Sequence, residues 1–220
     1  MCFSTAASIG SGIVLTLIGI ATLKKTRAPQ EYLFASIPLL FGIQQFSEGY
    51  LWFLLSHNGA LFQIKIATGI YLAFAQIVWP VWIPLSIILL EKQPVFRAIL
   101  SVFLCIGIVV SFVLAYYLYA FDVSATIAGQ HIYYNLNYPN TFLTIGGSFY
   151  LLATILPLLF TQYKSMWYLG VAIFISYLIS AVYYESYLIS VWCFFAACIS
   201  ILVYNIFLEI KNTTEYSKYP

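Results

Sequence analysis

Long apolar runs separated by short polar breaks make up most of the 220-residue sequence. Each run is about 20 residues long, which is the length that a helix needs to cross the hydrocarbon core of a bilayer. The pattern therefore predicts an all-α, polytopic membrane protein, with a single domain over residues 1–220 that forms a bundle of seven transmembrane helices. The predicted helices cover residues 5–23, 33–56, 65–90, 97–121, 141–161, 166–184 and 187–208.

The composition excludes two broad classes of protein. Hydrophobic residues account for 63% of the sequence and charged residues for 7%, and the mean hydropathy is +0.94. A soluble domain needs a polar surface that this composition cannot supply. The net charge is only +2 and the basic residues are scattered, which argues against a nucleic-acid partner. We expect the partner to be the lipid bilayer of a cell membrane, and the sequence does not predict an oligomeric state.

The Lys and Arg residues indicate the orientation, because the cytoplasmic loops of membrane proteins are rich in these two residue types. In the predicted order of helices, one side of the membrane receives Lys24, Lys25, Arg27, Lys92, Arg97, Lys164, Lys211 and Lys218. Only Lys65 falls on the other side. We therefore predict an outside N-terminus and a cytoplasmic C-terminus, and we interpret the first apolar run as a retained helix rather than a signal peptide.

The first predicted helix carries a stripe of small residues. Ser8, Gly12, Thr16 and Gly19 follow one another at spacings of three and four, so they lie on one helical face. Small side chains at such spacings let a neighbouring helix approach closely. We expect this face to form a tight helix–helix contact.

The third predicted helix contains Pro80 and Pro84, interleaved with Trp79 and Trp82. A proline inside a helix removes an amide donor and crowds the carbonyl four residues earlier. We therefore expect a kink near mid-membrane and freed carbonyls at Gln76 and Pro80 that point toward protein or water. The two tryptophans would either line a ligand cavity or fill space beside the kink.

Glu48 is a carboxylate inside the second predicted helix, on one stripe with Gln44 and Trp52 and next to Gln45. No Lys or Arg lies well inside a predicted helix, so we expect Glu48 to be protonated, to accept hydrogen bonds from neutral donors, or to bind a cation. An ionisable group at membrane depth is costly, and it usually faces the interior of the bundle. The sequence predicts an outward-facing intramembrane site around Glu48 that binds a small ligand, a lipid or a metal ion.

Further residues extend this candidate site. If Met1 is removed, Cys2 presents an amine and a thiol on adjacent atoms, which suits a soft transition metal or a nucleophile. The candidate metal ligands are Cys2, Glu48, His131 and Cys193, and the candidate catalytic residues are Glu48 and Cys2. The candidate ligand-binding residues are Gln44, Gln45, Trp52, Gln76, Trp79, Trp82, Ser190 and Trp192. Alternative interpretations stay open for these residues. In them, Glu48 and Cys193 are packing residues, His131 is an interfacial polar residue and Cys2 is incidental.

Four separated segments resemble an uncharacterised bacterial family of small integral membrane proteins that begin Met-Cys-Phe-Ser and are catalogued as a domain of unknown function. They are the opening MCFSTAAS, PLLFGIQQFSEG at Pro38–Gly49, WPVWIP at Trp79–Pro84 and SVWCFFAA at Ser190–Ala197. One departure is Gln44 or Gln45, where we expect many relatives to have histidine. The resemblance implies a bacterial inner membrane and groups Cys2, Glu48, Trp79, Pro80, Trp192 and Cys193, but it carries no activity.

Three hypotheses for the function follow from the sequence. The first is a membrane-embedded binding, metal or cofactor site, with catalysis left open. A zinc hydrolase like the alkaline ceramidases is disfavoured, because only His57 and His131 are present. The second is a small transporter of the SWEET or PQ-loop type, although the sixth predicted helix has no counterpart of Glu48. The third is a receptor-like protein that binds an apolar ligand, and the last helix lacks the lysine that retinal would need.

Overall fold

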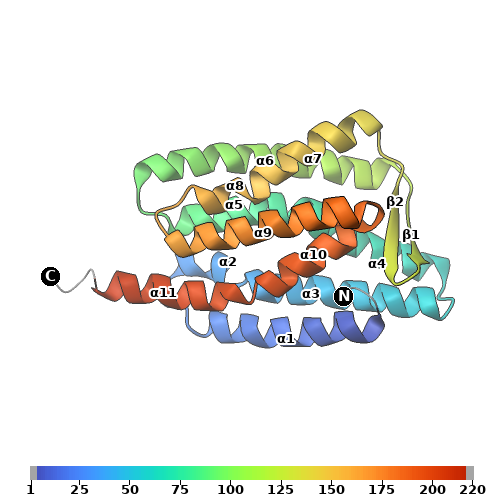
Figure 1. The fold of residues 1–220 in the computed structure, drawn as a ribbon, viewed down its shortest axis with the longest axis horizontal. Coiled ribbons are helices and arrows are strands. Elements are labelled where there is room, and N and C mark those ends of the chain that lie inside the picture. The colour runs from blue at the N-terminus through green and yellow to red at the C-terminus, as the bar shows by residue number, and fades with distance from the viewer. Residues whose placement is uncertain (1–3, 217–220) are drawn as a thin grey trace.

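The computed structural model describes residues 4–216, except for the side chains of residues 140–144 and 211–216. The chain is mostly helical, with one β-hairpin (Figure 1). Its elements are α1 (Thr5–Leu23), η1 (Pro29–Glu31), α2 (Tyr32–Ala35), α3 (Ile37–Ser56), α4 (Leu61–Ala73), η2 (Phe74–Val78), α5 (Trp79–Leu90), α6 (Pro94–Ala120), β1 (Val123–Ala128), β2 (His131–Leu136), α7 (Asn140–Thr154), α8 (Leu156–Leu159), α9 (Lys164–Tyr183), η3 (Glu185–Tyr187), α10 (Leu188–Ile199) and α11 (Leu202–Tyr216).

The long helices run roughly side by side, so that their connections gather at two ends of the molecule (Figure 1). We call one the hairpin end, which holds β1, β2 and the α3–α4 turn, and the other the basic end. The turns of the basic end, together with the first turns of α6 and α9, carry Lys24, Lys25, Arg27, Lys92, Arg97 and Lys164. Lys65 lies in α4 near the hairpin end, 3.9 Å from the Asp122 carboxylate. The grouping of these cations is as predicted, and Lys218 lies outside the described residues.

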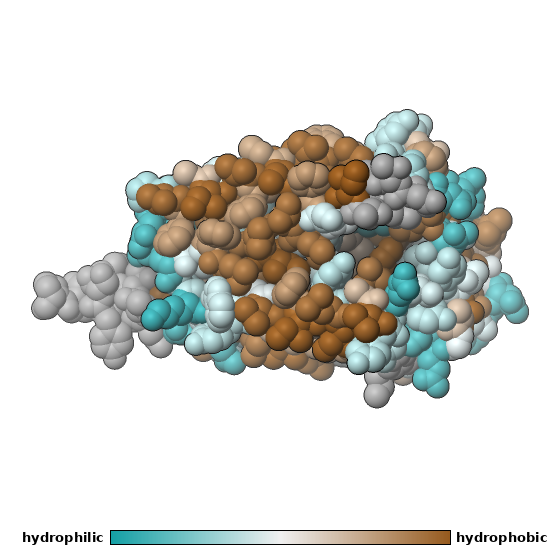
Figure 2. Space-filling view, turned by 45° about the horizontal axis from the view of Figure 1, so that its top comes forward, coloured by the Kyte–Doolittle hydropathy of each residue, from teal (hydrophilic) through white to brown (hydrophobic). Residues whose placement is uncertain are grey.

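Several helices are long and apolar enough to cross a membrane. Over residues 4–216 these are α1, the continuous run α4–η2–α5, α6 and α9, and a fifth is added if α10 and α11, bent by 42°, form one span. The helix α3 has the length, but Gln44, Gln45 and Glu48 lower its hydropathy. Large apolar side chains lie exposed on the outer faces, such as Phe112, which is 74% exposed. Figure 2 shows this apolar surface in the middle of the molecule, with polar residues toward both ends.

The small-residue stripe of α1 packs against α3, as the sequence predicts. A Cβ atom added to Gly19 would lie 2.6 Å from the backbone nitrogen of Leu39. One added to Gly42 of α3 would lie 2.6 Å from the hydroxyl oxygen of Thr16. The two backbones therefore approach more closely than any side chain at these positions would allow, which fixes the face that α3 turns to the rest of the bundle.

The proline-rich helix contains a feature that the sequence did not predict. A π-helical turn at η2 precedes Pro80, within a helical run from Leu61 to Leu90 that is long enough to be one span. The freed backbone carbonyls accept hydrogen bonds from neighbouring helices. The Ser111 hydroxyl donates to the carbonyl of Ile77 at 2.7 Å, and the Tyr150 hydroxyl donates to that of Ala75 at 2.6 Å. The wider turn lets the proline ring fit while side chains replace the lost backbone donors.

The β-hairpin corrects the all-α prediction, which treated residues 122–140 as a loop. Strands β1 and β2 pair antiparallel, with Ala125 opposite Tyr134, and Gly129 takes a positive φ of 63° in the turn. One face of the hairpin is buried, and the Tyr134 ring stacks on Tyr71 of α4 with centroids 5.0 Å apart. The hairpin thus closes this end of the helical bundle with an apolar face.

Other boundaries shift for local reasons. The second predicted helix breaks at Ser36 into α2 and α3, and Pro38 lies in the first turn of α3, where a missing amide costs little. The fifth bends at Ile155, just before Pro157, into α7 and α8. The last helix breaks between α10 and α11 at Ser200, whose hydroxyl donates back to the Ala197 carbonyl at 2.7 Å. These breaks change the direction of the helices, but the predicted stretches of sequence remain helical on both sides of each break.

Candidate functional site

Glu48 lies on α3, completely buried, and meets α10. Its Oε1 atom accepts a hydrogen bond from the Ser190 hydroxyl at 2.6 Å, and Ser190 is likewise completely buried. A carboxyl group therefore holds together two helices that are far apart in the sequence. A short O–H···O contact of this kind is the geometry expected where a carboxyl oxygen is the acceptor.

The rest of the predicted polar stripe also faces inward. Gln44 is completely buried and Trp52 is 5% exposed. The Gln44 Oε1 atom accepts a hydrogen bond from the Trp79 indole of α5 at 2.9 Å, and the Trp79 ring stacks on Phe41 with centroids 3.9 Å apart. The stripe thus forms a polar contact between α3 and α5 inside the apolar bundle, and Trp52 packs in the apolar cluster near the hairpin.

Two predicted ligand-binding residues make contacts between helices. The Ser11 hydroxyl of α1 donates to Gln45 Oε1 at 3.3 Å, so Gln45 belongs to the α1–α3 interface. The Trp82 indole donates to the backbone carbonyl of Leu33 in α2 at 3.0 Å. Both side chains therefore have structural partners that explain a polar group at their positions.

Cys193 of α10 links the buried carboxyl to a cavity. It lies one helical turn after Ser190, and its buried thiol neighbours Tyr71, Glu48 and Gln44. The same residue lines a cavity on its other side. Glu48 is not among the residues that line that cavity, and it lies one side chain behind Cys193.

The core cavity, as we call it, has a volume of about 310 Å³, is open on one side and is bounded by the hairpin and by five helical segments, η2, α6, α7, α9 and α10. Of the predicted ligand-binding residues it contains Gln76 and Trp192, and of the predicted metal ligands it contains Cys193. Its lining residues are Ala75, Gln76, Leu114, Leu136, Tyr138, Gly146, Gly147, Tyr150, Leu151, Tyr177, Leu188, Ile189, Trp192 and Cys193.

A few polar groups meet in this mainly apolar cavity. The Tyr138 hydroxyl donates to Gln76 Oε1 at 3.0 Å, which fixes the amide at the η2 turn. Burial raises the pKa of Tyr138 to about 12, so the phenol stays a neutral donor at physiological pH. The rings of Tyr150 and Tyr177 contact Trp192 edge to face, with centroids 5.8 and 5.3 Å away. An apolar wall with one amide and several phenol groups suits an uncharged or weakly polar organic molecule.

A smaller cavity adjoins the first on the side of the basic end. It has a volume of about 50 Å³, and Tyr150, Trp192 and Cys193 line both spaces. The Trp79 ring and Phe41 form part of its far wall. Trp79 thus lies at a cavity, as the sequence predicts, while its indole nitrogen is engaged by Gln44.

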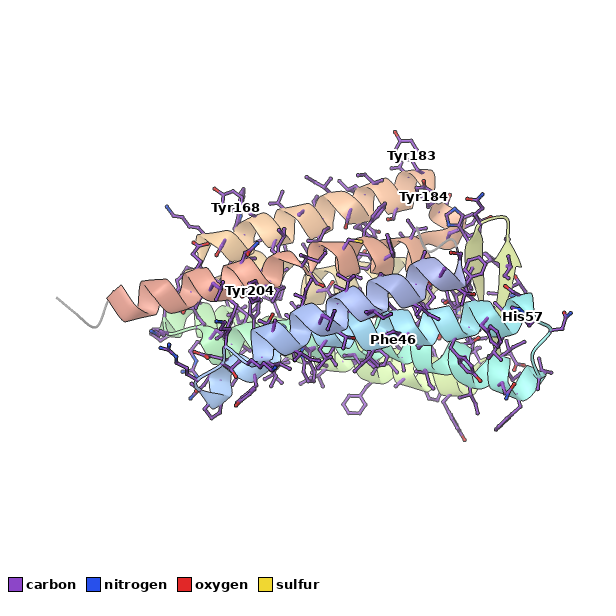
Figure 3. The ribbon with its side chains drawn as sticks, turned by 90° about the horizontal axis from the view of Figure 1, so that it is seen from below. Phe46, His57, Tyr168, Tyr183, Tyr184 and Tyr204 are labelled. Carbon is purple, nitrogen blue, oxygen red and sulfur yellow. The ribbon has the colours of Figure 1, made fainter. Side chains whose placement is uncertain are left out.

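His131 does not join Glu48 and Cys193. Its ring stacks on Tyr187 with centroids 4.7 Å apart, and meets Tyr184 edge to face at the hairpin end, where Figure 3 labels Tyr184. Burial lowers the pKa of His131. Within residues 4–216, no three His, Cys, Asp or Glu side chains are grouped so as to hold a metal ion. Cys2, the remaining predicted ligand, lies outside the described residues.

A second buried carboxylate was not predicted. Glu91 is 3% exposed, where α5 ends. Its Oε1 atom accepts from the backbone amides of Lys92 and Gln93, each at 2.9 Å. Its Oε2 atom accepts from the Thr161 hydroxyl at 2.9 Å and from the Gln162 amide at 3.0 Å. The only sequence signal is an acidic residue three positions before Pro94, which begins α6.

The tyrosines of the core cavity were also missed. The sequence contains 19 tyrosines, and nothing in their spacing distinguishes Tyr138, Tyr150 and Tyr177 from those at the membrane interfaces. Tyr138 was placed in a loop, and only the hairpin brings it against Gln76. Such a cluster arises from tertiary structure, which periodicity within one helix does not encode.

Comparison with known proteins gives a family but no activity. A family model described as "Family of unknown function (DUF6629)" matches residues 1–217. No curated protein and no solved structure matches the chain. The match covers almost the whole sequence and agrees with the resemblance to an uncharacterised family.

Proposed function

We propose that this chain, which belongs to the Family of unknown function (DUF6629), is an integral membrane protein. We propose that it binds a small amphipathic, lipid-like molecule in the core cavity. The polar part of the ligand would meet Gln76 and Tyr138, and its apolar part would lie along Trp192 and the neighbouring walls. Catalysis is not required by this proposal.

We propose further that the chain crosses the membrane seven times, because each long helical run extends between the two ends of the molecule (Figure 1). The helix α3 would cross in spite of its low hydropathy, since Gln44 and Glu48 are turned inward and are completely buried. The basic end would lie in the cytoplasm by the positive-inside rule. The core cavity, which reaches the hairpin, would then lie in the outer half of a bacterial inner membrane.

The observation that carries the binding proposal is the chemistry of the core cavity. Its volume of about 310 Å³ lies at the lower end of the range for small-molecule sites, roughly 300–1,000 Å³. A mainly apolar lining with a few convergent polar groups is how such sites are built. Gln76 supplies an amide and Tyr138 a neutral phenol, which favour a hydroxyl, amide or ester group over a charged one.

Glu48 would support the wall of this site from behind. Its hydrogen bond to Ser190 fixes the register of α10, and Cys193 and Trp192 of the same helix line the cavity. A carboxyl group held in this way can also store a proton close to the ligand. A transition-metal site that includes Cys2 remains a prediction from the sequence, and the described side chains favour an organic ligand.

The experiment is native mass spectrometry of protein released from membranes in a gentle detergent. Gly147 lines the cavity, and a Cβ atom added there would meet open space, so Gly147→Phe should fill the mouth without a clash. Gly69→Phe is the matched control, because Gly69 of α4 also has open space but lies outside the cavity. Wild type and control should carry one organic adduct that Gly147→Phe loses. A wild-type protein with no adduct, or with a metal ion alone, would contradict the proposal.

A further inference from the structure

A second hollow lies beside the core cavity, between α6 and α7, and we call it the α6–α7 groove. It has a volume of about 360 Å³ and is open on one side. Its lining is entirely apolar and consists of Cys105, Ile106, Val109, Val110, Val113, Ile145, Gly146 and Phe149. From Cys105 to Val113 the helix rises about 12 Å, which gives the groove the shape of a channel along α6.

If the chain spans the membrane as proposed, the groove would belong to the surface that faces the hydrocarbon of the bilayer. Val109 and Phe112 of α6 are 62% and 74% exposed, and Ile145 and Phe149 of α7 are 54% and 46% exposed. An apolar groove on such a surface is filled by hydrocarbon in a membrane, because lipid chains are the solvent there. The occupant chemistry is therefore a saturated or unsaturated alkyl chain rather than a peptide or a polar solute.

Gly146 joins the groove to the core cavity. It lines both spaces, and as a glycine it places no side chain between them. Its neighbour Gly147 also lines the core cavity, and a Cβ atom there would contact nothing within 4 Å. We call the place at Gly146, where a cavity with polar groups and a groove without any lie next to each other, the Gly146 window.

We infer that the ligand of the core cavity is a lipid-like molecule with a single alkyl chain, which passes through the Gly146 window and lies in the α6–α7 groove. The polar end would stay at Gln76 and Tyr138. This inference rests on the proposed function and adds to it the tail of the ligand and the route by which the ligand reaches the site from the bilayer. Head and tail would be recognised by separate parts of the chain, so that variants can separate the two.

The test uses monoacylglycerols with acyl chains of about 8 and about 16 carbons as probes, so that the head group is constant. The ligand that the purified protein carries from its own membrane is first exchanged for a probe. Native mass spectrometry then measures how much of the probe the protein retains. Wild-type protein should retain the long-chain probe at least tenfold more strongly than the short-chain probe. In Gly146→Leu the side chain closes the window, so this preference should fall below about threefold.

A second variant keeps the test valid if Gly146→Leu does not fold. Val109→Trp should fill the groove from the exposed face of α6 without touching the window, and it should also remove the preference for the long chain. The matched control is Val102→Trp, because Val102 is 60% exposed on the same helix but does not line the groove. The control should behave as wild type.

The outcomes separate the two proposals. If the wild type retains both probes equally and neither Gly146→Leu nor Val109→Trp changes this, the tail route is wrong while binding in the core cavity stands. If the wild type retains neither probe and carries no organic adduct from its own membrane, the proposed function fails and the tail route fails with it. If Val109→Trp retains neither probe while Val102→Trp retains both, the claim that separate parts of the chain recognise the head and the tail would also be overturned.

Discussion

Two buried carboxylates, Glu48 and Glu91, differ in what holds them. Glu48 is completely buried in the middle of α3, and the Ser190 side chain donates to it from α10. Glu91 is 3% exposed at the end of α5, and three of its four donors are backbone amides from two turns. The residue type and the burial are nearly the same, but the partners are of different kinds.

We interpret this difference as one between a structural role for Glu91 and the functional role that we propose for Glu48. Three of the four donors of Glu91 are backbone amides, which need an acceptor wherever these turns form. Glu91 therefore ties the α5–α6 turn to the α8–α9 turn and needs no ligand. The Tyr163 hydroxyl donates to the Leu90 carbonyl beside it at 3.2 Å and strengthens the same tie. Glu48, by contrast, meets a hydroxyl from the helix that lines the core cavity. Changing Glu48 should therefore affect the site more than the fold, and changing Glu91 the reverse.

The largest effect on stability is expected from Glu91→Ala. The substitution removes the acceptor of four partly buried hydrogen bonds, from the amides of Lys92, Gln93 and Gln162 and from the Thr161 hydroxyl, and each lost bond costs about 1 kcal/mol. We expect a total loss of about 4 kcal/mol in the free energy of unfolding, measured by thermal or denaturant unfolding in detergent. Glu91→Gln, which keeps one acceptor oxygen, should lose about half as much. A loss below about 1 kcal/mol in Glu91→Ala would show that the turns do not depend on this carboxylate.

A smaller loss of stability is expected from Ser190→Ala. It removes the hydroxyl that donates to Glu48 Oε1 and leaves a buried carboxyl oxygen without that donor, which costs about 2 kcal/mol. The same unfolding measurement applies, with Ser186→Ala in η3 as the control, since Ser186 is exposed. Equal stability of Ser190→Ala and the control would mean that the α3–α10 contact is not held by this hydrogen bond.

Glu48→Gln should cost little stability, about 1 kcal/mol, because the amide oxygen can still accept from Ser190. Retention of the organic adduct, read by native mass spectrometry, should fall clearly below that of wild type, because an amide NH2 group then replaces a carboxyl oxygen beside the Cys193 thiol, which lines the cavity. Glu91→Gln is the matched comparison, because that variant should retain the adduct although its free energy of unfolding falls by more than that of Glu48→Gln. Unchanged retention in folded Glu48→Gln would remove Glu48 from the site.

The smallest effect is expected at Tyr138. In Tyr138→Phe the hydrogen bond to Gln76 is lost, with a cost of about 1 kcal/mol. Because burial raises the pKa of Tyr138 from 10.0 to about 12, the folded state binds more protons than the unfolded state between these values. The free energy of unfolding should therefore fall as the pH rises through that window, and the fall should be smaller in Tyr138→Phe. Identical pH profiles for the two proteins would contradict a buried phenol.

The helical runs and the interior face of α3 could be predicted from the sequence. Apolar length predicts helices of membrane-spanning size, and the spacing of Gln44, Glu48 and Trp52 places them on one buried face. Small residues in α1 predicted the close contact with α3. These features depend on positions within one helix, so the periodicity of the chain encodes them directly.

The rest depends on which elements meet. The partner of Glu48 lies 142 positions later at Ser190, and the sequence places it near only through its polar spacing in the last helix. The hairpin was missed because the apolar pattern of residues 123–136 is short and is interrupted by tyrosines. Proline predicted lost backbone donors but not the π-helical turn, since Ser111 and Tyr150 come from other helices. Contacts between elements determine the cavity, and no local pattern reports them.

The most direct test of the central claim is a crystal structure at high resolution, grown in a lipid mesophase from protein that has kept the ligand of its own membrane. The account predicts elongated density in the core cavity, with one end within hydrogen-bonding distance of Gln76 and an unbranched tail that passes Gly146 into the α6–α7 groove. A core cavity that contains only water, or that is closed by its own side chains, would contradict the account.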